Sequence, residues 1–330
     1  MPVSVALVGA DGSGKTTLFN ALTRGRGADG VGMVDVPDER LQRLAGAVQP
    51  KKVVPAQVRI ADAPAGSKAQ RIAAAREADV VLKVARCFGP DPDPVADLAT
   101  LEVDLAVTDL ATVEKRLELV EREVRVGKKA GTEELEVLRL AREHLDGGRA
   151  LTSLALEPAQ RALLAPLFPV SAKPAVVVAN VDEALLPDGG APAAALGADA
   201  VVVPARLEAE LAELDPAEAA EYRGSYGLRE GGLDAVARAV WWAGGLITYF
   251  TAGEPEVRAW PCERDAPAPV AAGVIHTDFE KHFIRAEVTS VDELVAAGSM
   301  DALRAAGKLR VEGREYRVQD GDVVFFRVGR

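Results

Sequence analysis

A glycine-rich segment near the N-terminus constrains the fold more than any other feature of the sequence. Residues 9–16 read Gly-Ala-Asp-Gly-Ser-Gly-Lys-Thr and match the phosphate-binding loop (P-loop) pattern in full. A short valine-rich run at 3–8 precedes the segment, and a helix is predicted at 15–22. Strand, loop and helix in this order are the context that the motif requires. The sequence therefore predicts an α/β fold built around this loop.

The residue types of the loop suit a nucleoside triphosphate. Its backbone N–H groups and the N-terminus of the following helix favour phosphate, and the glycines let the backbone wrap around it. The motif assigns Lys15 to the β- and γ-phosphates and the hydroxyl of Thr16 to Mg²⁺. An ordinary glycine-rich turn is the alternative. The expected phosphate-binding residues are Asp11, Gly12, Ser13, Gly14, Lys15, Thr16 and Thr17.

Asp62 is the second candidate for the metal site. It ends a strand predicted at 57–61 and is followed by Ala-Pro-Ala-Gly at 63–66. A carboxylate in this place holds Mg²⁺ through water, and a following backbone N–H approaches the γ-phosphate. Alternatively, Asp62 caps the helix that is expected near Lys68, and the two roles are compatible.

Further strands are predicted at 80–85, 175–179 and 200–203. Strands that alternate with helices imply crossover connections and a mostly parallel sheet that is covered on both faces. The sequence thus predicts one such sheet, although about 90 residues separate the first of these three segments from the second.

A helical arm is predicted to interrupt this sheet. A Pro-rich boundary at 89–94 is followed by apolar residues at mostly three- and four-residue steps from Leu98 to Val124, which is typical of a long amphipathic helix. The pattern breaks at 127–132 and resumes at Leu135, so we expect a helical hairpin with its tip at the break.

From Ile247 onward the pattern changes to short strands and turns, which indicates a small mixed α+β domain. The elements expected there are strands at 257–260, 283–288, 314–318 and 323–328 and a helix at 290–297.

Length and charge restrict the remaining function classes. A chain of 330 residues with 48% hydrophobic residues is expected to form two or three domains. The net charge of -11 disfavours non-specific attraction to nucleic acid, which depends on Lys and Arg neutralising phosphates. We expect no specific DNA partner, and any RNA contact must use a local patch.

The cysteines and the N-terminus indicate a reducing, cytoplasmic location. Cys87 and Cys262 lie far apart and lack metal-ligand spacing, so neither a disulfide framework nor a zinc site is expected. The N-terminus lacks the basic flank and apolar length of a signal peptide, and no stretch approaches the roughly 20 apolar residues that span a membrane.

Motifs along nearly the whole chain resemble the YchF/Obg-like ATPase family. The C-terminal motifs are the most specific, because no general rule for P-loop proteins demands them. The matching segments are 17–23, 36–41, 179–183, 248–253 (Thr-Tyr-Phe-Thr-Ala-Gly), 256–260, 272–281 (Ala-Gly-Val-Ile-His-Thr-Asp-Phe-Glu-Lys), 283–286 and 320–322.

The resemblance implies a GTPase-like G-domain with an inserted coiled coil and a C-terminal β-grasp (TGS) domain. It also implies ATP and Mg²⁺ as ligands and the ribosome as a partner. The expected boundaries are 1–94 and 151–246 for the G-domain, 95–150 for the arm and 247–330 for the TGS domain.

The base-reading motif separates ATP from GTP. GTPases normally use Asn-Lys-x-Asp, whose aspartate accepts two hydrogen bonds from guanine, and residues 180–183 read Asn-Val-Asp-Glu here. Because discrimination by buried hydrogen bonds is large, loss of that aspartate predicts weak guanine preference and favours ATP. Without the resemblance, the motif would be read as a polar turn. The expected base-binding residues are Asn180, Val181, Glu183, Ala205 and Arg206.

Three departures from the family bear on hydrolysis. Between Arg24 and Val34 the chain is shorter than the family's switch I region, and no threonine stands there to give Mg²⁺ a second hydroxyl. The Gly-rich segment of the family is missing after Gly66, and the segment from Asp62 to Gly66 is one residue longer than the usual Asp-x-x-Gly. Phosphoryl transfer depends on positioned water and charge stabilisation, so binding is better supported than turnover, and no catalytic residue is assigned.

Three functions therefore stay open. The first is a slow Mg²⁺-dependent ATPase that acts as a translation-associated switch, and the second is a nucleotide- and ribosome-binding module without turnover. The third is a small-molecule kinase, since such loops also serve kinases, but it explains neither the Asn-Val-Asp-Glu segment nor the C-terminal motifs.

Overall fold

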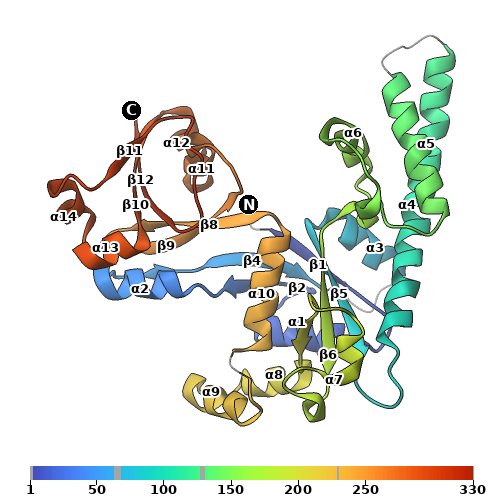
Figure 1. Cartoon of the computed structure of the whole chain (residues 1–330), viewed down its shortest axis with the longest axis horizontal. Coiled ribbons are helices and arrows are strands. Elements are labelled where there is room, and N and C mark those ends of the chain that lie inside the picture. The colour runs from blue at the N-terminus through green and yellow to red at the C-terminus, as the bar shows by residue number, and fades with distance from the viewer. Residues whose placement is uncertain (1–2, 63–67, 127–130, 229, 330) are drawn as a thin grey trace. The chain divides into compact units, whose positions relative to one another are not determined.

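The computed structural model describes residues 3–62, 68–126, 131–228 and 230–329 (Figure 1). These residues divide into two units, each described by itself. The P-loop unit contains Ser4–Gly32 and Ile60–Val236, and the C-terminal unit contains Met33–Arg59, Ala237–Arg330 and the first residues up to Val3. The C-terminal unit thus includes residues 33–59 and 237–246, which the sequence analysis assigned to the G-domain. The division into three domains stays a prediction.

The first sheet is mostly parallel, and its strands β1, β5, β6 and β7 belong to the P-loop unit, whereas most of β2 and β4 falls within residues 33–59. Six strands lie in the order β2-β4-β1-β5-β6-β7, and β1, β5, β6 and β7 pair in parallel. The central strand β5 is almost continuously apolar and buried, as expected for a strand covered on both faces. The predicted α/β fold is confirmed. The strands are β2 (Val31–Val36), β4 (Ala56–Ala61), β1 (Ser4–Val8), β5 (Val80–Cys87), β6 (Ala175–Val181) and β7 (Val201–Val203).

Helices lie between these strands in the chain or follow β7, and Asp93 and Asp215 cap two of them, α4 and α9. The helices are α1 (Lys15–Thr23), α3 (Lys68–Glu77), α4 (Pro94–Arg125), α5 (Thr132–Asp146), α6 (Pro158–Leu164), α7 (Gly190–Ala194), α8 (Ala205–Leu211), α9 (Pro216–Ser225) and α10 (Gly232–Ala243). Among the described residues, no helix combines the length and the apolar character that crossing a bilayer requires.

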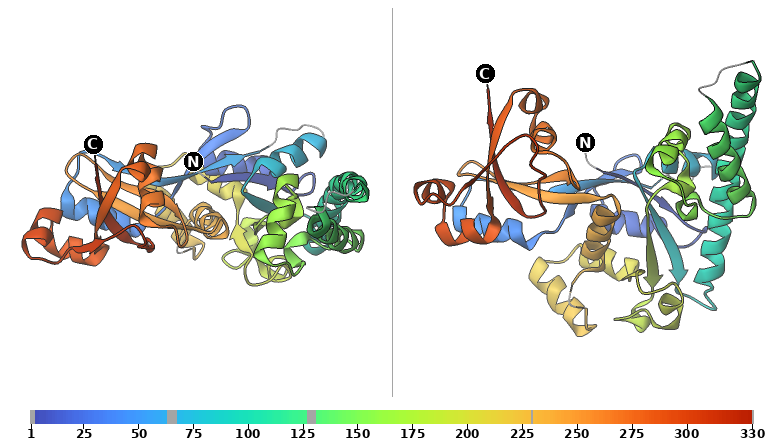
Figure 2. Two further views of the ribbon diagram at one scale, coloured as in Figure 1. Left: turned by 90° about the horizontal axis from the view of Figure 1, so that it is seen from above. Right: turned by 45° about the horizontal axis from the view of Figure 1, so that its top comes forward.

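The predicted helical hairpin is formed by α4 and α5, which lie side by side and antiparallel (Figure 1; Figure 2). Asp93 caps α4 by accepting a hydrogen bond from Ala96 N at 3.0 Å, and Pro94 occupies the first turn. The apolar stripe read from the sequence is the seam of the pair, where Val113, Val120 and Leu138 are buried. Part of the predicted tip, 127–130, lies outside the described residues.

A buried carboxylate attaches the arm to the sheet. Asp109 of α4 is fully buried and accepts hydrogen bonds from Val170 N at 3.0 Å and Ser171 N at 2.7 Å. These residues form the short 3-10 helix Val170–Ala172, which directly precedes β6. A carboxylate that satisfies two backbone donors fixes where α4 crosses this turn.

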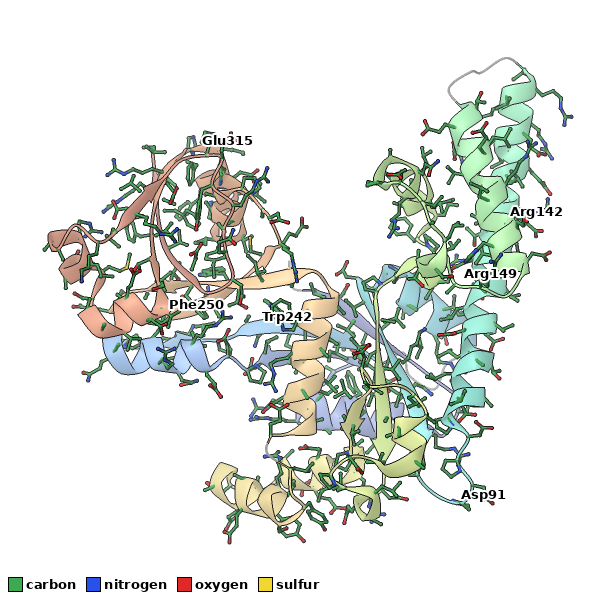
Figure 3. The ribbon with its side chains drawn as sticks, viewed as in Figure 1. Asp91, Arg142, Arg149, Trp242, Phe250 and Glu315 are labelled. Carbon is green, nitrogen blue, oxygen red and sulfur yellow. The ribbon has the colours of Figure 1, made fainter. Side chains whose placement is uncertain are left out.

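The C-terminal unit has a second sheet, in the order β11-β10-β12-β8-β9-β3. Its apolar core includes Tyr249, Val288 and Phe326. Phe250, labelled in Figure 3, is also fully buried, and the Arg40 guanidinium lies 5.3 Å from its ring centroid. The elements are α2 (Glu39–Val48), β3 (Val53–Val54), β8 (Leu246–Ala252), β9 (Val257–Glu263), α11 (Ala268–Ile275), α12 (Thr277–Lys281), β10 (Phe283–Ser290), α13 (Val291–Ala297), α14 (Met300–Ala305), β11 (Arg310–Glu312) and β12 (Asp322–Val328).

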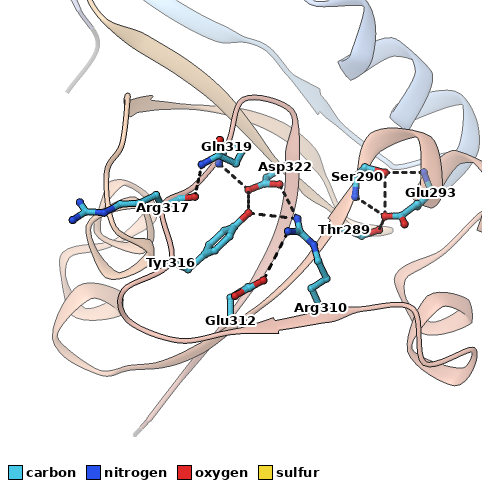
Figure 4. Close-up of polar contacts among 9 residues, drawn as sticks. All are labelled: Thr289, Ser290, Glu293, Arg310, Glu312, Tyr316, Arg317, Gln319 and Asp322. Carbon is cyan, nitrogen blue, oxygen red and sulfur yellow. Dashed lines mark hydrogen bonds and ion pairs between the residues drawn. The ribbon is translucent and has the colours of Figure 1, made fainter.

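One predicted strand of this unit is wrong. Residues 314–318 form a turn and a single bridge residue, and the strand lies earlier, at β11. The cause is the buried carboxylate of Asp322, which accepts hydrogen bonds from Tyr316 Oη at 2.7 Å and Gln319 N at 2.9 Å (Figure 4). These bonds to a local side chain compete with strand pairing. The predicted helix at 290–297 is confirmed as α13, which Ser290 and Glu293 begin with a capping box.

Candidate functional site

The loop between β1 and α1 has the backbone geometry that its glycines suggest. Gly14 is the N-cap of α1, with a φ of 87°, and Gly12 has a φ of 79°. A β-carbon at Gly14 would collide with the side-chain amide of Asn180, and one at Gly9 would collide with the carbonyl oxygen of Val84. Only glycine fits at these two positions, because both the space and the dihedral angles exclude a side chain.

Lys15 lies over the loop and is almost buried. Its Nζ donates hydrogen bonds to the carbonyl oxygens of Gly9 at 3.1 Å and Ala10 at 2.8 Å. Burial lowers the pKa of Lys15, and the positive charge of Arg71 lowers it further, against the opposing charges of Asp11 and Asp62. An anion that reaches the loop would therefore stabilise the charged form of this buried ammonium group.

Thr16 and Asp62 form the predicted metal pair. The Thr16 hydroxyl donates a hydrogen bond to Asp62 Oδ2 at 2.9 Å, and Asp62 is buried although Thr16 is exposed. A hydroxyl and a carboxylate are the hard oxygen ligands that Mg²⁺ takes, with water and phosphate completing the shell. The backbone N–H that was expected to approach the γ-phosphate falls in 63–67, outside the described residues.

Asn180 connects the two halves of the predicted site. It lies in the buried C-terminal part of β6, and its Nδ2 donates to the carbonyl oxygen of Ser13 at 3.0 Å. Its Oδ1 accepts from the backbone N of Ala205 at 3.2 Å, at the start of α8. One side chain therefore holds the P-loop and the two loops after β6 and β7 together, and these are the carboxyl ends of parallel strands, where ligands of α/β proteins bind.

The other predicted residues differ in their placement. Val181 and Ala205 are buried, and Glu183 is half-buried at the start of a 3-10 turn. Thr17 is exposed in the first turn of α1. The Arg206 side chain pairs with Glu210 at 3.3 Å on the surface of its own helix, so it does not join the other predicted side chains.

Two residues of this region had no signal in the sequence. Arg71 of α3 donates to Asp11 Oδ1 at 2.8 Å, and the Tyr226 hydroxyl donates to Glu183 Oε2 at 3.1 Å. Neither belongs to a motif, and each contacts a residue more than 40 positions away in the chain. Only the fold brings such residues together.

The residues present fit a nucleotide with its metal ion. The Ser13 hydroxyl is buried inside the loop and has no hydrogen-bond partner among the described residues. An unpaired buried polar group is costly, and phosphate oxygens or water at the loop would satisfy it. No group of three or more His, Cys, Asp or Glu side chains that could hold a metal ion occurs in the described part of the chain. The Thr16 and Asp62 pair accords with this, since Mg²⁺ needs few protein ligands when phosphates bind it.

A cavity of about 290 Å³ borders the loop on the side of α3 and α4. Asp97 and Asp104 of α4 line it together with Asp11. Carboxylates repel a triphosphate, so this cavity does not suit the phosphate tail. The ammonium group of Lys15 and the hydroxyl of Thr16, at the start of α1, are groups suited to phosphate and its metal ion.

Comparisons with known proteins agree with this geometry. The family model YchF-GTPase_C, described as "Protein of unknown function (DUF933)", matches residues 246–329. The chain is 37% identical to the "Ribosome-binding ATPase YchF" of Bacillus subtilis and 36% identical to that of Haemophilus influenzae, with 99% of each chain covered in both cases. The chain belongs to the YchF family. The solved "Structure of the Schizosaccharomyces pombe YchF GTPase" has a TM-score of 0.87 at 27% identity and covers 98% of this chain and 97% of its own.

The length of the YchF alignment shows that this chain is shorter than its relative. The alignment extends over 364 positions with the Bacillus subtilis relative, more than the 330 residues of this chain. The alignment must therefore open gaps in this chain. The two segments expected to be shorter than in the family are the one between Arg24 and Val34 and the one after Gly66.

Proposed function

We propose that this protein binds Mg²⁺-ATP in preference to GTP, hydrolyses it slowly and acts as a cytoplasmic switch in association with the ribosome. The contact between Thr16 and Asp62, next to the almost buried Lys15, carries the proposal. These three groups supply what the phosphate tail and its metal need, which are an ammonium group, a hydroxyl and a carboxylate.

In the proposed complex, Lys15 leaves the carbonyl oxygens of Gly9 and Ala10 and turns to the β- and γ-phosphates. The Thr16 hydroxyl and, through water, Asp62 hold Mg²⁺, which neutralises charge on the phosphates when bound. Backbone N–H groups of the loop and of the first turn of α1 orient the tail in this proposal, because the first N–H groups of a helix have no partner within the helix.

The base is proposed to bind between the segment at 180–183 and the start of α8. Asn180 keeps both segments in place, and Val181 and Ala205 supply buried surface. Glu183 stands where GTPases have the aspartate that reads guanine, which favours adenine here. Arg206 is proposed to contact the base through its backbone alone, because its side chain pairs with Glu210.

Calorimetric titration of ATP and GTP, each with and without Mg²⁺, tests this proposal. ATP is expected to bind more tightly than GTP and only weakly without the metal. Lys15→Ala is expected to abolish binding of both, whereas Lys308→Ala, an exposed lysine of the C-terminal unit, should bind like the wild type. Normal binding by Lys15→Ala would place the site elsewhere.

A second candidate is a nucleotide- and ribosome-binding module without turnover. The absence of a threonine between Arg24 and Val34 favours it, since Mg²⁺ then lacks one hydroxyl ligand. Single-turnover phosphate release separates the two functions, because the module would bind ATP and release no phosphate.

Ribosome association is proposed from the names of the relatives, two of which are "Ribosome-binding ATPase YchF" proteins. Co-sedimentation with purified ribosomes, with ATP and without nucleotide, is the direct test. We expect the protein to pellet with the ribosomes, and a protein that stays in the supernatant under both conditions would contradict this part of the proposal.

A further inference from the structure

The carboxylate of Glu183 has a fixed partner that no motif predicts. Tyr226 follows α9, 43 positions later in the chain, and its hydroxyl donates to Glu183 Oε2 at 3.1 Å. A hydrogen bond to a charged acceptor is stronger than one between neutral groups, so it restricts how the carboxylate can turn.

Packing holds the tyrosine ring in place. The ring contacts an apolar cluster formed by Leu207 and Leu211 of α8 and Ala219 of α9. The ring of Tyr222 lies 5.9 Å from it, at an angle of 44°. The hydroxyl is therefore presented to Glu183 by a ring whose position α8 and α9 determine.

We propose that Tyr226 is a specificity-determining residue, which selects adenine over guanine by engaging one oxygen of the Glu183 carboxylate. The inference rests on the proposed function, because it requires the base to bind at the segment 180–183. Guanine carries two neighbouring donors, on N1 and on the 2-amino group, and reading both requires two carboxylate oxygens that face the base together. Adenine offers the single 6-amino donor on the same edge, next to an acceptor.

Tyr226 changes what the carboxylate can accept. The hydrogen bond uses one of the two acceptor directions of Oε2 and holds the plane of the carboxylate, so in the proposed complex Oε1 is the oxygen that meets a donor on the base. One acceptor matches the 6-amino group of adenine and leaves one donor of guanine unpaired, and an unpaired buried donor weakens binding.

The protonation of Tyr226 agrees with this role. The hydrogen bond to Glu183 raises the pKa of the phenol, and burial and the negative charge of Glu183 raise it further. The hydroxyl thus keeps its proton throughout the neutral range and always acts as the donor.

Tyr226→Phe isolates the hydroxyl, because it keeps the ring in the cluster. Calorimetry of the full-length variant with Mg²⁺-ATP and Mg²⁺-GTP should show that the ratio of ATP affinity to GTP affinity falls about tenfold, the size expected for a hydrogen bond to a charged group. Tyr222→Phe, which alters the neighbouring tyrosine, should leave the ratio at the wild-type value. A purely structural tyrosine would lower both affinities equally, and a ratio unchanged in Tyr226→Phe overturns the inference.

Glu183→Ala gives the same information without altering the tyrosine. The ATP preference should be lost in this variant, and adding Tyr226→Phe to it should change the ratio no further, since the two residues act through one bond. A preference that survives in Glu183→Ala would also refute the inference. The proposed function fails separately, through a wild-type protein that binds neither nucleotide.

Discussion

Lys15 determines the electrostatics of the phosphate site. Its ammonium group is almost buried and donates only to carbonyl oxygens within the loop, so part of its hydration is lost without a full counter-charge. The pKa of Lys15 is lowered first by this burial and then by Arg71. A triphosphate restores the missing negative charge, which makes phosphate binding favourable and dependent on pH.

The affinity for ATP should fall as pH rises into the alkaline range, because Lys15 loses its proton below the ordinary lysine value of 10.5. Arg71→Gln removes the repulsion by the neighbouring guanidinium, raises the pKa of Lys15 and should move this fall to higher pH. Nucleotide titrations across the alkaline range measure both midpoints. Identical midpoints in the two proteins would show that Arg71 does not act on Lys15.

The Thr16 hydroxyl should account for much of the metal dependence. Thr16→Ala removes a Mg²⁺ ligand and the hydrogen bond to Asp62, so ATP affinity with Mg²⁺ should fall at least about tenfold, while affinity without the metal changes little. Thr16→Ser keeps the hydroxyl and serves as the control. Equal loss of affinity with and without Mg²⁺ would assign Thr16 to phosphate rather than to metal.

Helices, strands and turns differ in how well the sequence predicts them. The spacing of apolar residues predicted the arm, and α4 and α5 occupy the predicted segments because one apolar stripe on each helix must be buried. β2 carried no such prediction, since it is a short strand of six residues in which every second residue is buried. The turn at 314–318 was wrongly predicted as a strand for another reason. It depends on hydrogen bonds to Asp322, a residue that lies beyond the segment.

The seam of the arm should carry much of its stability. Leu138→Ala, in the fully buried face of α5, is expected to lower the free energy of unfolding by about 2–5 kcal/mol, from lost apolar burial and the cavity that remains. Leu140→Ala on the exposed face of the same helix, where the side chain is 46% exposed, should change it by less than about 0.5 kcal/mol. Chemical denaturation of both variants tests this, and equal effects would contradict the packing described for the hairpin.

Glu287 lies in β10 of the C-terminal unit, where burial by itself would raise the pKa of its carboxyl group. Hydrogen bonds from Arg327 and Arg304 and their charges outweigh burial and lower this pKa to about 2, from 4.5. Because the pKa is lower in the folded state, the stabilisation is complete above pH 4.5 and is lost as pH falls from 4.5 towards about 2.

In Glu287→Gln, the free energy of unfolding should therefore fall less steeply than in the wild type as pH decreases from 4.5 towards about 2. Glu315→Gln, an exposed carboxylate of the same unit (Figure 3), is the control and should decline like the wild type. Denaturant titrations at a series of acid pH values give the comparison. Parallel curves for wild type and Glu287→Gln would show that the arginines do not stabilise the charged carboxylate.

For the whole molecule, the sequence predicted the architecture better than the assembled site. The P-loop could be read directly because its local spacing fixes the backbone, and the structure places the segment between β1 and α1, with Gly14 as the N-cap of the helix. Asp62 was found because it ends a strand, and Asn180 because a family motif marks it. Arg71 and Tyr226 were missed because each acts on a residue distant in sequence, and no local pattern encodes such a contact.

The most direct test of the account is a crystal structure of the protein with Mg²⁺ and a non-hydrolysable ATP analogue. We predict that the backbone amides of residues 11–17 contact the triphosphate, that Lys15 Nζ moves from Gly9 and Ala10 to the phosphates, and that Mg²⁺ lies beside Thr16 and Asp62. A nucleotide bound away from this loop, or a loop that stays closed by Lys15 with saturating analogue present, would contradict the central claim.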